Sequence, residues 1–250
     1  MKHIIPIILI VFGISANAQN YQTIIDSANA NYTQGNYEAA IEYYNQVLDS
    51  GYEATEIYYN LGNAYFRSNK TTKAIINYER ALKLNPDDED VQFNLQLSKQ
   101  YVVDKIDVLP EFFLTKWYKS FIKMFSSNAW AIVSMSGFIL GLIFILIYFL
   151  VQQIGLKKIG FWLGLLFILI SITSFTFSYH QKQFALAKDK AIIVTPTVVV
   201  KSTPDKSGTD LFVIHEGLKV IITDELGDWH EIKLTDGSKG WLKKSDLEVI

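Results

Sequence analysis

Two long apolar runs constrain the fold of this 250-residue chain more than any other feature. They cover residues 129–151 and 159–179, contain no charged side chain, and are separated by the short link 152–158. About 20 apolar residues in an α-helix match the hydrocarbon core of a bilayer, and a soluble helix is rarely apolar on every face over that length. The sequence therefore predicts an antiparallel transmembrane hairpin, with the segments before and after it on one side of the membrane.

Each run also contains a pair of glycines four residues apart, Gly137 with Gly141 and Gly160 with Gly164. Such pairs allow helix backbones to approach closely in lipid. Two interpretations stay open: the glycines form the contact between the two helices, or they are chance occurrences in helices that tolerate glycine.

Residues 1–18 are typical of a secretory signal peptide, with a basic start, an apolar stretch and the sequence Ala-Asn-Ala at 16–18. Cleavage before Gln19 would place the rest of the chain outside the cytoplasm. The absence of cysteine excludes disulfides, thiolate nucleophiles and a lipid-attached cysteine. We therefore expect an inner-membrane protein with both soluble parts in the periplasm and the link 152–158 in the cytoplasm.

After this segment the sequence repeats with a period of 34 residues, which decides the fold of residues 19–107. The recurring pairs are Ala28 and Gly62, Ala40 and Ala74, Tyr44 and Tyr78, and Val47 and Ala81. The second copy also contains Tyr58, Leu61, Tyr65 and Pro86 at the expected spacing. These residues resemble the tetratricopeptide repeat, which implies an all-α domain of paired helices. A further helix over residues 91–102 would cover the open end of this short array.

The resemblance implies that the first helix of each pair lines a concave groove that binds peptides or proteins. The groove residues would be Asn29, Tyr32, Tyr59, Asn63, Phe66 and Arg67. Some relatives clamp a terminal carboxylate with asparagines and lysines. Asn29 and Asn60 fall at the asparagine places of such a clamp, but Ile25, Asp90 and Asn94 occupy the basic places, which argues against a clamp. The alternative is that the six residues are ordinary solvated helix surface.

Charge adds one constraint on partners. Residues 19–107 contain 13 acidic and 7 basic side chains, a net charge of −6, and the whole chain has a net charge of −2. This excludes a basic surface for nucleic acid and favours a partner segment with positive or mixed charge.

The segment 111–127, just before the first apolar run, carries an aromatic stripe opposite a lysine stripe. Phe113, Trp117 and Phe121 share one helix face, whereas the lysines at 116, 119 and 123 share another. This pattern predicts an interfacial helix in contact with lipid headgroups. The alternative is the frayed start of the first transmembrane helix.

Residues 191–250 change to short β-type runs with turn residues between them. The runs cover residues 191–201, 210–215, 218–224, 229–234 and 240–243. The strings Leu-Phe-Val-Ile-His-Glu-Gly at 211–217 and Gly-Trp-Leu at 240–242 resemble the bacterial SH3 domain. That resemblance implies an all-β SH3-like barrel that binds peptides or cell-wall fragments, with Trp229 and Trp241 as candidate ligand contacts. Trp229 is the better candidate, because the Gly-Trp tryptophan of this family usually packs against the barrel.

No arrangement typical of catalysis is present. The two His-Glu dipeptides lack a second histidine four residues after the first, and the four histidines have no metal-ligand spacing. We therefore expect neither enzyme activity nor a cofactor nor a metal.

The order of signal peptide, repeats, two spans and SH3-like domain resembles the BatE-type family of the Bacteroides aerotolerance operon. This resemblance implies a multi-domain membrane scaffold with a role in aerotolerance or stress, in a complex with von Willebrand A-domain membrane proteins and a MoxR-type ATPase. The alternative is a cell-wall sensor or tether, in which the SH3-like domain binds peptidoglycan and the repeats recruit a hydrolase.

Overall fold

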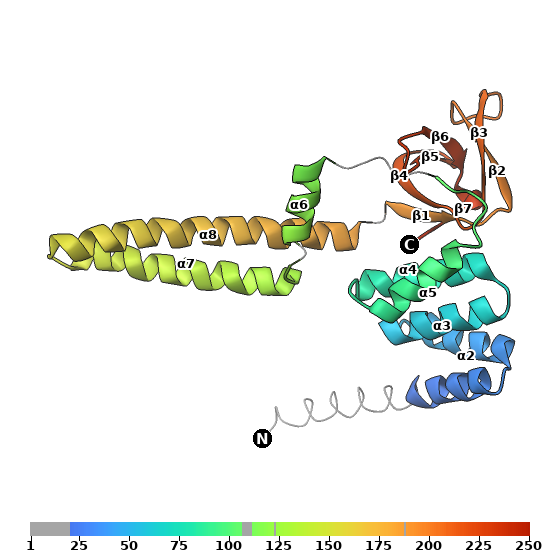
Figure 1. The fold of residues 1–250 in the computed structure, drawn as a ribbon, viewed down its shortest axis with the longest axis horizontal. Helices are drawn as coiled ribbons and strands as arrows, with labels where there is room; N and C mark the ends of the chain where they lie inside the picture. Colours follow the sequence, from blue (N-terminus) through green and yellow to red (C-terminus); the bar gives the residue numbers. More distant parts are fainter. Residues whose placement is uncertain (1–20, 107–111, 123, 188) are drawn as a thin grey trace, which may run out of the picture. The chain divides into compact units, whose positions relative to one another are not determined.

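The structure, a computed structural model, describes residues 21–106, 112–122, 124–187 and 189–250 (Figure 1). The expected signal peptide at 1–18 and its cleavage site lie outside the described residues. Two compact units divide the chain: one combines the segments before residue 110 and after residue 187, and the other is the segment between them. The second unit is thus inserted into the sequence of the first.

The first unit begins with antiparallel helices that follow the 34-residue period. They are a helix over residues 21–33, α2 (Tyr37–Asp49), α3 (Thr55–Arg67), α4 (Thr71–Leu84) and α5 (Glu89–Lys99). Small residues lie where helices cross: a Cβ added to Gly62 would lie 2.6 Å from a ring carbon of Tyr78, and Ala74 is fully buried. The all-α repeat architecture is confirmed.

Helix α5 closes the array in the way expected of a terminal helix. Its N-terminus is capped by Asp88, whose carboxylate accepts a hydrogen bond from the Val91 N–H at 3.1 Å. Val91 and Leu95 are buried in the same apolar cluster as the repeat helices. Because α5 packs on α4, it covers the apolar face that the second repeat would otherwise expose.

Residues 189–250 form the β domain, a seven-stranded antiparallel sheet in the order β3-β2-β6-β5-β4-β1-β7 (Figure 1). The strands are β1 (Lys190–Ile193), β2 (Thr197–Lys201), β3 (Asp210–His215), β4 (Lys219–Leu226), β5 (Trp229–Lys233), β6 (Lys239–Lys243) and β7 (Leu247–Val249). The expected run 191–201 is two strands, since the chain turns at Pro196. The sequence pattern also missed β7, a three-residue strand that follows a short 3₁₀ helix.

The repeat helices and the β domain share an apolar contact within the first unit. Ile192 of β1 and Ile250 belong to the apolar cluster of the repeats. Gly217, with a φ of +84°, approaches the repeats so closely that an added Cβ would lie 2.9 Å from a methyl group of Val102. The β domain therefore packs on α4 and on the chain that follows α5.

Glu79 of α4 is the polar centre of this contact. Its side chain is only 7% exposed, and its carboxylate pairs with Lys99 of α5 at 2.9 Å and with Lys219 of β4. Burial raises the pKa of Glu79, but the two ammonium groups outweigh that effect and hold the pKa below its ordinary value. The carboxylate is therefore ionised at neutral pH and links a repeat helix to the β sheet.

Further polar contacts join the segment before the hairpin to the β domain. Arg80 pairs with Glu248 of β7 at 2.7 Å, and the Thr72 hydroxyl donates to Glu216 at 2.7 Å. The carboxylate of Asp104 accepts a hydrogen bond from the His215 backbone N–H at 2.6 Å and lies 2.9 Å from Nδ1 of the same residue. These contacts join residues more than 100 positions apart.

The second unit contains α6 (Phe113–Ile122), α7 (Ser127–Leu150) and α8 (Ile154–Leu186). Helices α7 and α8 are long and apolar enough to cross a membrane. Helix α8 begins before the expected second run and continues beyond its end. The link between the helices is therefore residues 151–153 and not 152–158, and Lys157 and Lys158 lie in the first turns of α8.

Small residues occupy the contact between α7 and α8. A Cβ added to Gly160 would lie 2.9 Å from the Phe144 carbonyl oxygen, and one added to Gly137 would lie 3.3 Å from that of Phe167. The buried hydroxyl of Ser134 donates to the Ser171 carbonyl at 2.9 Å. The glycine pairs thus serve the packing of the two helices, the first of the two interpretations left open by the sequence.

Helix α6 is separate from α7, so it is not the frayed start of that helix. The Trp130 indole N–H donates to the Ile122 carbonyl at 2.8 Å, and the Phe121 ring packs near both Trp130 and Phe177. Trp117 remains 69% exposed. One side of the helix therefore packs on α7 and α8, and its other side leaves aromatic rings and lysines exposed. Its contact with lipid headgroups stays a prediction.

The contact between α7 and α8 can be tested with a disulfide, because the chain contains no natural cysteine. We expect Ser134→Cys with Ser171→Cys to crosslink efficiently in membranes, since the two hydroxyl oxygens lie 3.3 Å apart. Adding Gly137→Leu should lower the yield several-fold by wedging the helices apart. Gly155→Leu is the control, because an added Cβ there meets nothing within 4 Å. Equal yields with both leucines would contradict this packing.

The contact at Glu79 predicts a loss of stability when its charge is removed. Glu79→Gln leaves two partly buried ammonium groups without their carboxylate, which should cost about 1–3 kcal/mol. Hydrogen exchange of β1 and α4 in the full chain should accelerate accordingly. Glu38→Gln is the matched control, because Glu38 and Lys70 form an exposed pair, and exposed ion pairs contribute little to stability. Equal exchange in both variants would refute the central role of Glu79.

The lowered pKa of Glu79 also fixes how the contact depends on pH. A carboxyl group with a lower pKa in the folded state adds stability above its ordinary value of 4.5, and this is lost as pH falls through the folded-state pKa. Exchange of β1 should therefore accelerate below pH 4.5 in the natural chain, and much less in Glu79→Gln.

Candidate functional site

The residues predicted to line the groove lie on the helix over residues 21–33 and on α3. Asn29 and Arg67 are exposed, whereas Tyr32, Tyr59 and Phe66 are partly buried against the repeat core. Because each side chain retains exposed surface, the helices present them on one polar and aromatic surface instead of burying them.

Two asparagines of this set make the same hydrogen bond in successive repeats. Asn29 Oδ1 accepts from the Tyr44 hydroxyl at 2.5 Å, and Asn63 Oδ1 accepts from the Tyr78 hydroxyl at 2.7 Å. Burial raises the pKa of Tyr44 to about 12 and raises that of Tyr78 further, so both hydroxyls remain protonated donors. The buried tyrosines thus fix the orientation of the two asparagine amides.

A second hydrogen bond also recurs: each of the two Oδ1 atoms accepts from an asparagine of a neighbouring helix. The Asn60 amide donates to Asn29 Oδ1 at 3.5 Å, and the Asn94 amide donates to Asn63 Oδ1 at 3.0 Å and to the Tyr59 hydroxyl at 3.1 Å. The equivalent residues are 34 positions apart, so the contacts form an asparagine ladder made of residues 29, 60, 63 and 94. Among the described residues, the Nδ2 groups of Asn29 and Asn63 have no acceptor and can donate to a ligand.

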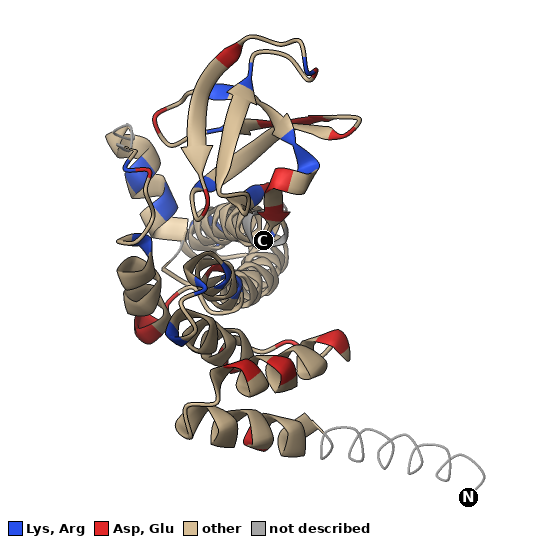
Figure 2. Cartoon of the chain, turned by 90° about the vertical axis from the view of Figure 1, so that its right-hand side faces the viewer, with Lys and Arg blue, Asp and Glu red and all other residues tan. Residues whose placement is uncertain are grey.

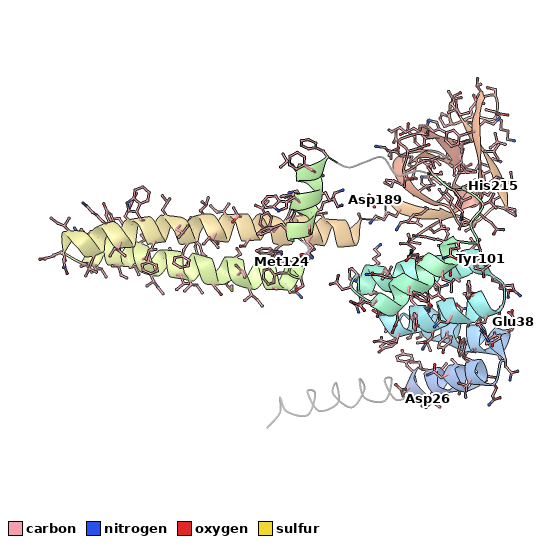
Figure 3. All side chains as sticks on the ribbon, viewed as in Figure 1. Asp26, Glu38, Tyr101, Met124, Asp189 and His215 are labelled. Carbon is pink, nitrogen blue, oxygen red and sulfur yellow. The ribbon has the colours of Figure 1, made fainter. Side chains whose placement is uncertain are left out.

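Aromatic contacts lie beside the ladder. The Arg67 Nε donates to the Tyr37 hydroxyl at 3.1 Å, and its guanidinium lies 5.5 Å from the centre of that ring. Tyr32 packs edge-on against Tyr37. The centre of the Phe66 ring lies 5.7 Å from that of Tyr101. Tyr101 follows α5 and is labelled in Figure 3. Amide donors, exposed rings and one guanidinium can together recognise a polypeptide by its backbone and side chains.

The sequence reasoning missed four members of this surface: Tyr37, Asn60, Asn94 and Tyr101. Asn60 and Asn94 were considered only as places in a carboxylate clamp. Their 34-residue separation, matched by that of Asn29 and Asn63, was the signal that would have found the ladder. Tyr101 carried no such signal, because its contact depends on the turn after α5.

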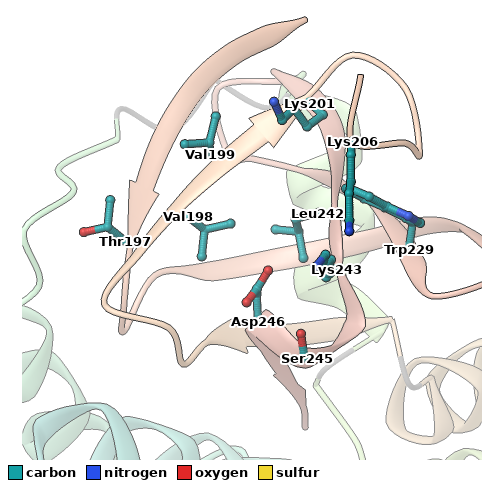
Figure 4. A pocket seen from close by; sticks show the side chains of 10 residues that line it. All are labelled: Thr197, Val198, Val199, Lys201, Lys206, Trp229, Leu242, Lys243, Ser245 and Asp246. Carbon is teal, nitrogen blue, oxygen red and sulfur yellow. The ribbon is translucent and has the colours of Figure 1, made fainter. Parts of the chain in front are cut away.

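A second candidate site lies in the β domain. A pocket of about 380 Å³ is lined by Trp229, three lysines and apolar residues of β2 and β6 (Figure 4). Trp229 lies beside Lys206, whereas Trp241 is not part of the lining. The structure thus separates the two predicted ligand contacts and brings only Trp229 into a pocket.

Comparison with known protein families finds a match for one part of the chain. Residues 25–89 match the family described as tetratricopeptide repeat. This region contains three of the four ladder asparagines, and also Arg67 with its neighbours Tyr37 and Phe66. No curated protein matches the chain. Groups of three or more metal-binding side chains are absent from the described residues.

Proposed function

We propose that this protein is a non-enzymatic, membrane-anchored scaffold that binds partner proteins through its tetratricopeptide repeats. The asparagine ladder carries this proposal, because tyrosine hydroxyls and neighbouring amides hold its Oδ1 atoms and orient its Nδ2 donors. An extended segment needs donors at regular spacing, and the 34-residue period supplies them. Repeats of this family generally bind proteins or peptides.

The contacts of Glu79 support the proposed topology. They join the chain before the hairpin to the chain after it, which requires both soluble parts in one compartment. Two membrane-spanning helices meet that requirement, and one would not. The Ala-Asn-Ala sequence at 16–18 favours the periplasm as that compartment.

The resemblance to the BatE-type family suggests which partners the groove binds: von Willebrand A-domain membrane proteins of the same complex, with a role in aerotolerance or stress. The acidic residues of the repeat helices (Figure 2) favour partner segments of positive or mixed charge. The second candidate function is a cell-wall sensor or tether that holds peptidoglycan, and the pocket beside Trp229 favours it.

The groove is tested by removing two neighbouring side chains of α3. We expect Phe66→Ala with Arg67→Ala to abolish co-purification of the von Willebrand A-domain proteins from intact, crosslinked cells. Aromatic and arginine anchors often contribute about 2 kcal/mol or more each to an interface. The stability loss should be smaller than the roughly 3–5 kcal/mol of a fully buried phenylalanine, because Phe66 is only partly buried.

Phe93→Ala provides the matched control, since this phenylalanine of α5 is 67% exposed and lies outside the ladder. It should leave capture unchanged. Capture at the natural level by the double variant would remove the groove as the binding surface, whereas a large drop in melting temperature would assign Phe66 to the core.

The topology is tested with reporters. A reporter fused after Ile250 and one inserted after Asp107 should both report the periplasm, because two spans return the chain to its original side. A cytoplasmic signal from either position would refute the proposed arrangement.

A further inference from the structure

The sheet of the β domain opens between β2 and β6. In the described part of the chain these strands pair at one position, Lys201 opposite Trp241, although β2 pairs with β3 along its whole length. A register shift between Val200 and Lys201 turns β2 at this point. The next pairs that this register would bring together, Val200 with Leu242 and Val199 with Lys243, do not form in the described sheet. The two strands diverge, and the pocket beside Trp229 occupies the gap.

Hydrogen bonds on the outer sides of these strands show which backbone groups face the gap. The Glu216 N–H donates to the Pro196 carbonyl, so this carbonyl faces β3. Because successive residues of an antiparallel strand direct their backbone groups to opposite sides, the N–H and C=O groups of Thr197 and Val199 face away from β3. The Lys244 N–H donates to the Asp228 carbonyl, so the Lys243 N–H likewise faces away from β5. The Lys243 carbonyl belongs to the N-cap of the 3₁₀ helix Lys244–Asp246 and accepts the first hydrogen bond of that helix. The β2 edge of the gap therefore presents backbone donors and acceptors, and the β6 edge presents a donor.

The side chains around the gap combine an apolar floor with positive charge. Val198 and Leu242 are buried and form the floor. Lys201 is paired with Asp210, whereas Lys206 and Lys243 have no acidic partner among the described residues. Asp246 is the one acidic group in the lining, and it accepts a hydrogen bond from Thr195. Because Asp210 neutralises Lys201, the two unpaired lysines against Asp246 leave a surplus of one positive charge.

We propose that this gap binds a short, extended acidic peptide, which adds a strand between β2 and β6. The free edges would pair with the peptide backbone, and acidic side chains on one face of the peptide would reach Lys206 and Lys243. Trp229 would pack against an apolar side chain of the peptide. A volume of about 380 Å³ lies within the range of about 300–1,000 Å³ usual for small-ligand sites, so only a few residues are held.

Two observations favour a peptide over a saccharide as the occupant. The unpaired groups belong to strand edges, whose spacing matches another extended polypeptide. The single aromatic ring lies at one side of the gap, and the floor consists of aliphatic side chains, which suit the alternating side chains of a strand. The excess of lysine then selects acidic sequences.

The proposal is tested by calorimetric titration of the full chain in detergent with capped hexapeptides. The probes are an alternating valine–glutamate peptide, the same peptide with glutamine in place of glutamate, and a glutamate peptide with alternate backbone nitrogens methylated. We expect the first to bind and each of the others to bind at least tenfold more weakly. Raising the ionic strength should weaken the binding of the first.

Matched variants locate the binding site. Lys243→Glu should weaken binding at least tenfold, whereas Lys233→Glu, which changes an exposed lysine of the neighbouring strand β5, should change it less than twofold. Phe66→Ala with Arg67→Ala should leave it unchanged, which separates this site from the groove of the repeats. Melting curves confirm that each variant is folded.

Several results would overturn the proposal. They are no binding of the glutamate peptide, equal binding of the glutamine or methylated peptide, and equal effects of Lys243→Glu and Lys233→Glu. Binding of soluble peptidoglycan fragments but of no peptide would also overturn it and would assign the pocket to the cell wall.

Discussion

The buried carboxylate of Glu79 makes one body from two segments that the chain separates by more than 100 residues. A carboxylate that is 7% exposed is stable as an ion only when cations are held against it, and here one cation comes from α5 and the other from β4. The repeat helices and the β domain therefore depend on each other, since neither alone supplies both lysines. Ile192 and Ile250 add apolar area to the same contact.

This dependence explains how a small repeat array is stabilised. About three repeat units are normally needed to bury a continuous core, and this chain has two repeats and one further helix. Helix α5 covers part of the open face through Val91 and Leu95, and the β domain covers Ile75 and Val102. The β domain thus supplies part of the support that a third repeat would otherwise give.

Local sequence patterns predicted most helices and strands, but they could not predict the contacts between segments that are distant in the sequence. The 34-residue period, the small residues at Gly62 and Ala74, and the charge-free runs each reflect one helix or one helix pair, which a single window of sequence can reveal. The pairing of Glu79 with Lys219 could not be predicted, because nothing in either neighbourhood marks the other as its partner. Helix α8 is longer than the sequence predicted, for a different reason. Hydropathy detects only the apolar part of a helix, and α8 continues into polar sequence at Gln181–Gln183.

The sheet order separates the two proposed recognition surfaces of the first unit. Strands β4 and β7, which pair with Glu79 and Arg80, lie with β1 at one end of the sheet order, and the gap between β2 and β6 lies towards the other. A ligand in the gap would therefore not need to displace the contact around Glu79, and the asparagine ladder lies on helices instead of on the sheet. Both surfaces belong to one compact unit. A partner with two suitable segments would therefore bind more tightly, because binding of its first segment raises the effective concentration of its second segment at the other surface. An acidic segment suits the gap, whereas a segment of positive or mixed charge suits the acidic repeats. This difference in charge would fix the orientation in which such a partner binds.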